Sequence, residues 1–312
     1  MAAAVRPSLM PQAIGFAVLA GLISSTLFLA LSSGAPGMVL LAYFVQLPLL
    51  FVGLSLGLAA SVIAAAGAIL VCSLIAGIVA AAMFALVQAV PAVVVVRQAL
   101  LSRRQDGKVE WYPLGLVLAQ LAALAALGIA TAFVLLLGQP GGLQGVLGEF
   151  VGAALAGLGA VEVEAVASPE LERWMFLFPG LMAASWLVMV VVNGVLAQAL
   201  AVRLGWNRRP SPALSELELP GWLWPAIGIA ALLAVIGDGG IGFLGRAVLI
   251  VLVVPYLFLG LAVIHALARR WPHRRLALGL FYVSVTLLGW PLLAVLLLGF
   301  VEDFAHVRQR YL

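Results

Sequence analysis

The chain has 312 residues, of which 65% are hydrophobic and 9% are charged, and its net charge is +4. Soluble domains carry about 25% charged residues, so this chain has too few polar groups to cover a surface exposed to water. The composition therefore excludes an ordinary soluble domain and indicates a membrane protein. Its basic residues form no patch interleaved with aromatic residues, so we expect the lipid bilayer, and no nucleic acid, as its environment.

Apolar stretches long enough to cross a bilayer recur along the whole chain, because a spanning helix needs about 20 such residues. The sequence predicts spans at 12–33, 38–56, 58–75, 77–97, 112–137, 174–202, 222–237, 243–268 and 276–300. We therefore expect an all-α fold, a polytopic transmembrane helical bundle of eight or nine spans that forms a single membrane domain over residues 1–312. The apolar run Ala13–Leu31 is longer than a typical signal-peptide core, which favours an uncleaved first span.

Basic residues gather between predicted spans and indicate the topology. Three clusters alternate correctly with the spans, and they contain Arg97, Arg103, Arg104 and Lys108, then Arg203, Arg208 and Arg209, then Arg269, Arg270, Arg274 and Arg275. The positive-inside rule places these clusters and the N-terminus in the cytoplasm. The C-terminus stays ambiguous: nine spans would put it outside, whereas Arg308 and Arg310 favour the inside. Either the last apolar stretch kinks or turns back at Gly289-Trp290-Pro291, or the 38–97 region holds two spans and a re-entrant segment, so eight and nine spans both stay open.

The segment 138–173 is acidic and is expected to be an extracytoplasmic loop. Its apolar residues repeat at helical spacing, namely Leu143, Val146, Leu147, Phe150, Val151, Ala154 and Leu158. This spacing predicts an amphipathic interfacial helix that lies on the membrane surface. Two roles stay open for it: a connecting helix packed on neighbouring spans, or a lid over a cavity that faces outward.

Polar residues inside the predicted spans are the candidates for a binding site, since each costs free energy in lipid. They are Gln46, Gln88, Gln120, Asn193, Gln198 and His265. For ligand binding we predict Asn193, Gln198, Gln120 and Gln88. The alternative for each is an interhelical hydrogen bond without a ligand.

Small residues spaced by four, Ala60, Ala64 and Ala68, predict a helix face that allows close approach of another helix. Packing within this protein and docking of a partner membrane protein both fit this face. If the face serves for docking, we expect a partner membrane protein to bind there.

Motifs that carry chemistry are scarce. The sequence Gly53-Leu54-Ser55-Leu56-Gly57 matches the G-x-S-x-G pattern of hydrolases, but it lies in an apolar helix instead of a strand-to-helix turn. An intramembrane enzyme would need Ser55 beside His265. The single Cys72 cannot form an intrachain disulfide, and no P-loop or zinc-peptidase motif is present. We expect no catalytic residue, no metal site and no cofactor.

Several short motifs, taken in order, resemble a known family. They are Leu47-Pro48 with the following Gly53–Gly57, Glu110–Gly115, Asn193 with Gln198 and Arg203-Leu204-Gly205, Leu219–Pro225, and Gly299–Phe304 with Arg308. Over nearly the whole chain their order is similar to the DUF2232 (YybS-like) bacterial membrane protein family, which is distantly related to S components of energy-coupling-factor transporters.

The resemblance implies a protein of the bacterial inner (cytoplasmic) membrane with an S-component-like core that binds or helps to transport a small molecule. It also implies separate coupling and ATPase subunits as partners. S components have fewer spans than this chain, and no vitamin-binding motif matches, so no ligand residue carries over. The alternative function is a non-transporting membrane scaffold or accessory subunit of a larger membrane complex.

Overall fold

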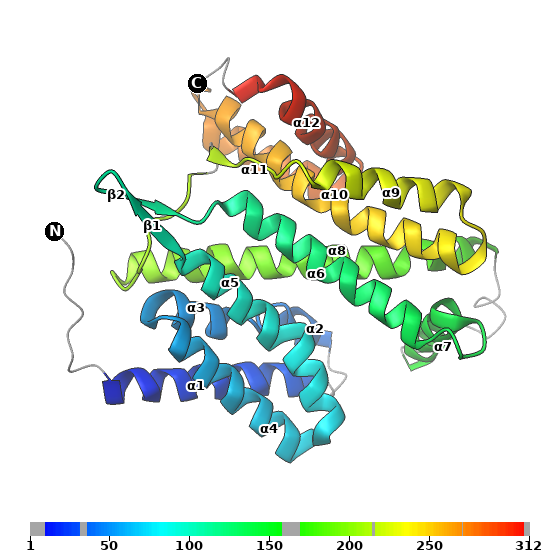
Figure 1. Cartoon of the computed structure of the whole chain (residues 1–312), viewed down its shortest axis with the longest axis horizontal. Helices are drawn as coiled ribbons and strands as arrows, with labels where there is room; N and C mark the ends of the chain where they lie inside the picture. Colours follow the sequence, from blue (N-terminus) through cyan, green and yellow to red (C-terminus); the bar gives the residue numbers. More distant parts are fainter. Residues whose placement is uncertain (1–9, 32–35, 158–168, 214–215, 270, 309–312) are drawn as a thin grey trace. The chain divides into compact units, whose positions relative to one another are not determined.

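The computed structural model describes the whole chain except residues 1–9, 32–35, 158–168, 214–215, 270 and 309–312 (Figure 1). The chain divides into two compact units. Unit 1 contains Met1–Val117 and Met189–Pro212, and unit 2 contains Leu118–Val188 and Ala213–Leu312. In the described residues the regular structure is helical except for one two-stranded hairpin, so the predicted all-α class is confirmed. That residues 1–312 form a single membrane domain stays a prediction.

In the described part of the chain, five helices are long and apolar enough to cross a membrane. They are Pro11–Ala30, Leu58–Leu100, Leu114–Leu135, Phe176–Arg203 and Gly239–Ala268. A bent pair of helices near the C-terminus makes a sixth candidate span. The protein is therefore a multi-span membrane protein, since helices of this length and composition are stable in a hydrocarbon core.

Unit 1 is built from α1 to α5, a β-hairpin and the end of α8. Its elements are α1 (Met10–Ala30), α2 (Pro36–Ala42), α3 (Leu47–Leu56), α4 (Leu58–Phe84), the π-helix η3 (Ala85–Ala89), α5 (Val90–Leu100), β1 (Ser102–Gln105), β2 (Lys108–Trp111) and α8 (Pro169–Arg203).

The longest helical stretch of unit 1 is interrupted at Gly77. Its φ of 84° and ψ of 176° are accessible to glycine and strained for other residues. The helix is kinked at this residue, and the α4 ribbon turns back before it reaches α5 (Figure 1). Val96 and Ser61 consequently both lie against Gly53, which means that α5 returns beside the first part of α4. The break lies at the first residue of the predicted segment 77–97.

Three residues of the first basic cluster, Arg103, Arg104 and Lys108, lie in an antiparallel hairpin, where the sequence indicated only a connection between spans. Strands β1 and β2 pair in the register Arg103↔Glu110 and Gln105↔Lys108. Asp106 and Gly107 form the turn with φ values of 52° and 76°, as expected for a two-residue Asp-Gly turn. The Asp-Gly pair was the sequence signal for this hairpin.

Unit 2 contains α6 (Leu114–Leu135) from Leu118 onward, α8 up to Val188, and five further helices. These are α7 (Gly142–Gly157), α9 (Leu223–Ile236), α10 (Gly239–Ala268), α11 (Arg274–Leu288) and α12 (Pro291–Ala305). Helix α7 confirms the helix predicted from apolar spacing, and Leu143 on it is buried. Its place on the membrane surface stays a prediction. Helices α10 and α12 cross where Gly260 meets the backbone of Val295 and Gly299 meets that of Tyr256.

The last apolar segment is a bent pair and not one straight helix. Helices α11 and α12 meet at an angle of 118° at the Gly289-Trp290-Pro291 break. Gly289 has a φ of 69°, and Pro291 begins the next helix. Within unit 2, the end of α12 lies at the same end as the connection between α10 and α11 (Figure 1).

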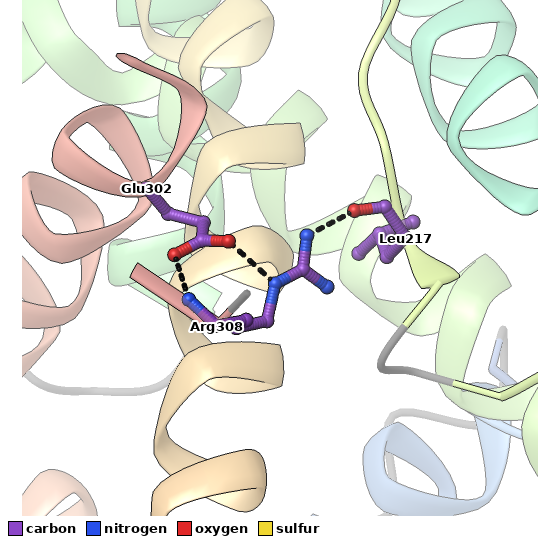
Figure 2. A network of polar contacts seen from close by, with 3 residues as sticks. All are labelled: Leu217, Glu302 and Arg308. Carbon is purple, nitrogen blue, oxygen red and sulfur yellow. Dashed lines mark hydrogen bonds and ion pairs between the residues drawn. The ribbon is translucent and has the colours of Figure 1, made fainter. Parts of the chain in front are cut away.

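A buried ion pair ties the C-terminal end of α12 to the segment before α9. The Nε atom of Arg308 donates to a carboxylate oxygen of Glu302 at 2.7 Å, and the backbone N–H of Arg308 donates to the other oxygen at 3.0 Å. A terminal guanidinium nitrogen also donates to the carbonyl oxygen of Leu217 at 2.6 Å (Figure 2). Both charged side chains are therefore paired and hydrogen-bonded, although both are buried.

Candidate functional site

A non-helical turn over residues 43–46 separates α2 from α3 inside unit 1. Pro48 has no backbone N–H, and Leu47 donates to the carbonyl of Phe44 at 3.1 Å instead of to that of Tyr43. Helix α3 then continues for ten residues, or about 15 Å, which is half of a hydrocarbon core about 30 Å thick. Where such a turn is surrounded by lipid, its backbone polar groups need partners from the protein.

Two side chains from other helices satisfy the carbonyls of this turn. Ser24 of α1 donates its hydroxyl to the carbonyl oxygen of Val45 at 2.8 Å. The amide nitrogen of Asn193 on α8 donates to the carbonyl oxygen of Tyr43, and also to that of Met189 at 2.8 Å. Both donors are buried, with exposed fractions of 0% for Ser24 and 1% for Asn193.

The turn also reaches the π-helix η3. Gln46 is fully buried, and its amide nitrogen donates to the carbonyl oxygen of Val87 at 3.1 Å. Pro91 lacks the N–H that an α-helix would direct to this carbonyl four residues earlier. Its position explains both why the helix widens into a π-turn and why Val87 can accept a bond from another segment. Such π-turns are frequent at functional sites.

Four buried amide oxygens of unit 1 have no hydrogen-bond partner among the described residues, and they belong to Gln46, Gln88, Gln98 and Asn193. Gln46 and Asn193 bond to the backbone at the helix breaks and Gln88 directly follows Val87 in η3, whereas Gln98 lies near the end of α5. The side-chain amides of Gln46 and Asn193 donate hydrogen bonds to backbone carbonyls through their nitrogen atoms, so their oxygen atoms are still able to accept. Buried acceptors are normally paired, and a set of them calls for hydrogen-bond donors. We call Ser24, Gln46, Gln88 and Asn193 the amide cluster.

The structure divides the four predicted ligand residues among three places. Asn193 and Gln88 belong to the amide cluster. Gln198 donates instead to the carbonyl oxygen of Arg209 at 3.0 Å, in the segment that follows α8. Gln120 lies on α6 in unit 2. Sequence reasoning did not select Ser24 at all, because a serine in a helix can bond to its own helix and gives no signal of a distant partner.

The basic residues after α8 hold the ends of three elements together. The backbone N–H of Arg208 donates to the carbonyl oxygen of Leu54, and its Nε atom to that of Ser55 at 3.3 Å. Arg209 is buried, donates to the carbonyl oxygen of Ala99 at 2.9 Å and lies 5.5 Å from the ring centre of Trp111. Burial lowers the pKa of the Arg209 guanidinium from its ordinary value. These contacts join the ends of α3, α5 and β2.

The predicted docking face on α4 is in contact with α1. Ala60, Ala64 and Ala68 are buried, and Gly21 of α1 lies directly on the backbone of Ala64 and Ala68, where no larger side chain would fit. The structure uses this face for close packing inside unit 1. Docking of a partner there stays a prediction, and it would require α1 to move away.

The two residues that an intramembrane enzyme would need side by side, Ser55 and His265, belong to different units. The hydroxyl of Ser55 in unit 1 is buried and has no partner among the described residues. In unit 2, the Nδ1 atom of His265 is 2.9 Å from the carbonyl oxygen of Leu261, and its Nε2 atom is 3.3 Å from the hydroxyl of Tyr282. Both ring nitrogens of His265 are thus engaged by groups of unit 2.

Comparison with protein-family models, curated proteins and solved structures gave no match for this chain. The fold and composition define its class, a multi-span helical membrane protein. The resemblance to the DUF2232 family stays a prediction.

Proposed function

We propose that this protein binds a small solute that donates hydrogen bonds, such as an amine, an amide or a polyol, at the amide cluster of unit 1. The observation that carries the proposal is the set of partnerless acceptors, the oxygens of Gln46, Gln88 and Asn193, on residues that belong or bond to the α2–α3 turn and to η3. A solute with several donors would satisfy these oxygens, which lipid cannot do. Each bond it forms contributes more there than in water, because the acceptor is already desolvated.

A transport-related role fits the position of the cluster. Transport proteins commonly bind their substrates near the bilayer midplane, where discontinuous helices expose backbone and side-chain polar groups. The α2–α3 break has this form, and helix α3 places it about 15 Å from its end at Gly57. We propose a role similar to that of S components, with coupling and ATPase functions supplied by separate subunits, since this chain carries no P-loop.

The proposed topology has eight spans with both termini in the cytoplasm of a bacterial inner membrane. The spans are 12–33, 38–56, 58–75, 77–97, 112–137, 174–202, 222–237 and 243–268, and the α11–α12 pair enters and leaves on the cytoplasmic side. The 118° bend and the common end of α12 and the α10–α11 connection support this arrangement (Figure 1). It places Arg308 with the other basic clusters, as the positive-inside rule requires.

Cysteine labelling tests this topology. In a Cys72→Ser background, single cysteines at Asp238 and Glu149 should react with an impermeant maleimide added to whole cells. Cysteines at Gln105 and His306 should react only after the membrane is opened. Labelling of His306→Cys from outside would show that the last segment crosses the membrane and would refute the eight-span topology.

Ligand binding is tested by thermal stability of the purified protein in the presence of a panel of amines, amides and polyols. The informative variant is Gln88→Leu, which removes one partnerless oxygen at similar volume. We expect the variant to be as stable as the parent or more stable, because a buried unsatisfied group is lost. We also expect it to lose at least half of the stabilisation that any solute of the panel gives to the parent.

The matched control is Gln198→Leu, which changes a second buried amide of unit 1 that already has a bond. This control should keep the solute effect. If no solute of the panel stabilises the parent, or if Gln88→Leu keeps the full effect, binding at the amide cluster is refuted.

One observation favours the alternative of a membrane scaffold or accessory subunit. The bonds from Ser24, Gln46 and Asn193 all end on backbone carbonyls, so the same residues also stabilise an irregular turn. Under this alternative the protein should co-purify in mild detergent with other membrane proteins. Gln88→Leu should then reduce the amount of the co-purifying proteins, and no solute should change the stability of the parent.

A further inference from the structure

An apolar groove runs along unit 1 between α1 and α3. Its volume is about 130 Å³, and its walls include Phe16 and Ile23 from α1, Phe51 and Leu56 from α3, and Trp206 from the segment after α8. The α1 side chains are partly exposed, 46% for Phe16 and 44% for Ile23. In a spanning helix, side chains with this exposure face hydrocarbon, so the groove is accessible from the bilayer.

Aromatic rings shape the Trp206 end of the groove. Trp206 meets Phe16 edge-on with ring centres 5.6 Å apart and stacks on Phe51 at 6.1 Å. Tryptophan is enriched where a membrane protein passes from hydrocarbon to headgroups, because the indole has an apolar body and a polar N–H. This end of the groove therefore corresponds to the headgroup level.

A cation lies beside the same end. Arg208 follows Trp206 by two residues, and its guanidinium lies over Gly57, next to the groove residue Leu56. Its Nε atom donates to the carbonyl oxygen of Ser55, and among the described contacts its terminal nitrogens have no acid partner. An anion at this position would complement the charge of Arg208.

We propose that the groove holds one acyl chain of an anionic phospholipid whose phosphate is bound by Arg208. The occupant is a lipid because the apolar walls open to the bilayer while the cation lies at the headgroup level. Guanidinium binds phosphate through paired hydrogen bonds, which favours arginine for such a site. The proposal is independent of the amide cluster, since no residue of that cluster lines the groove.

Native mass spectrometry of the full chain tests this site, with phosphatidylglycerol and phosphatidylcholine of identical acyl chains as probes. We expect the parent to retain phosphatidylglycerol in preference to phosphatidylcholine. Arg208→Gln should lower retention of phosphatidylglycerol about fivefold and leave phosphatidylcholine unchanged, as expected for one basic residue near an anionic lipid. Ile23→Trp, which fills the groove from its exposed side, should lower retention of both lipids.

The matched control is Arg104→Gln, which removes an exposed positive charge from the β1–β2 hairpin and should change neither lipid. Quenching of Trp206 by bromine on the acyl chain gives a second readout on the parent, with Trp206→Phe as the reference that removes its signal. Equal retention and equal quenching with the two lipids, or unchanged retention in Arg208→Gln, would overturn the proposal.

Discussion

The buried pair Glu302–Arg308 gives the sharpest stability prediction. The side chain of Glu302 is 2% exposed and that of Arg308 is 8% exposed, so neither charge can be rehydrated without a local opening of the structure. Arg308→Gln removes the positive charge, the ion pair and the bond to Leu217 (Figure 2), and leaves a carboxylate without its cation. Breaking a buried pair in this way costs about 3–5 kcal/mol.

The loss should be visible as a lower melting temperature. A domain of 150–250 residues loses about 2–4 °C for each kcal/mol, so we expect a fall of about 6–20 °C for unit 2. The assay is size-exclusion chromatography of the full chain after heating in mild detergent. The double variant Glu302→Gln/Arg308→Gln should recover most of the loss, because no charge is then left unpaired in the interior.

An exposed pair of the same chemistry provides the control. Arg103 and Glu110 are 2.6 Å apart, but their side chains are 74% and 49% exposed. Exposed pairs contribute about 0–1 kcal/mol, so Arg103→Gln should hardly change the melting temperature. If Arg308→Gln proves as mild as Arg103→Gln, burial does not make the Glu302–Arg308 pair essential and our reasoning is wrong.

Two further predictions concern glycines and use the same assay. Gly77→Ala should destabilise the protein by about 1–3 kcal/mol, because alanine is strained at a φ of 84°, whereas Gly67→Ala in the same helix has free space and should be neutral or stabilising. Gly260→Ala should cost about 1–3 kcal/mol by pushing α12 away from α10, and Gly279→Ala on α11 should not. Equal melting temperatures within either pair would contradict the corresponding argument.

The helical class and the membrane location could be predicted from the sequence because they depend on local properties. Apolar runs such as Leu114–Leu135 must form helices in lipid, where no other backbone arrangement of a single segment satisfies its polar groups. The spacing of Leu143 and its neighbours likewise predicted α7. The tripeptide Gly289-Trp290-Pro291 marked the break in the last apolar segment, but not the direction in which the chain continues, since that depends on packing.

The candidate site shows the limit of such prediction. Sequence indicated that Asn193, Gln88, Gln198 and Gln120 are polar residues in apolar surroundings, and each costs free energy there. Which of them share a site depends on contacts between residues far apart in the chain, such as Asn193 with Tyr43. Spacing within one helix carries no information about such a contact.

The amino-acid sequence by itself determined a polytopic helical membrane protein and the clusters of basic charge, because hydropathy and charge act residue by residue. Only the tertiary structure placed Ala64 against α1, separated Gln198 from Asn193, and brought Ser24 and Gln46 to one broken helix. These pairings are decided by which surfaces fit each other and by which carbonyls at the breaks near Pro48 and Pro91 accept bonds from other segments. Such contacts between distant residues form only when the whole unit packs.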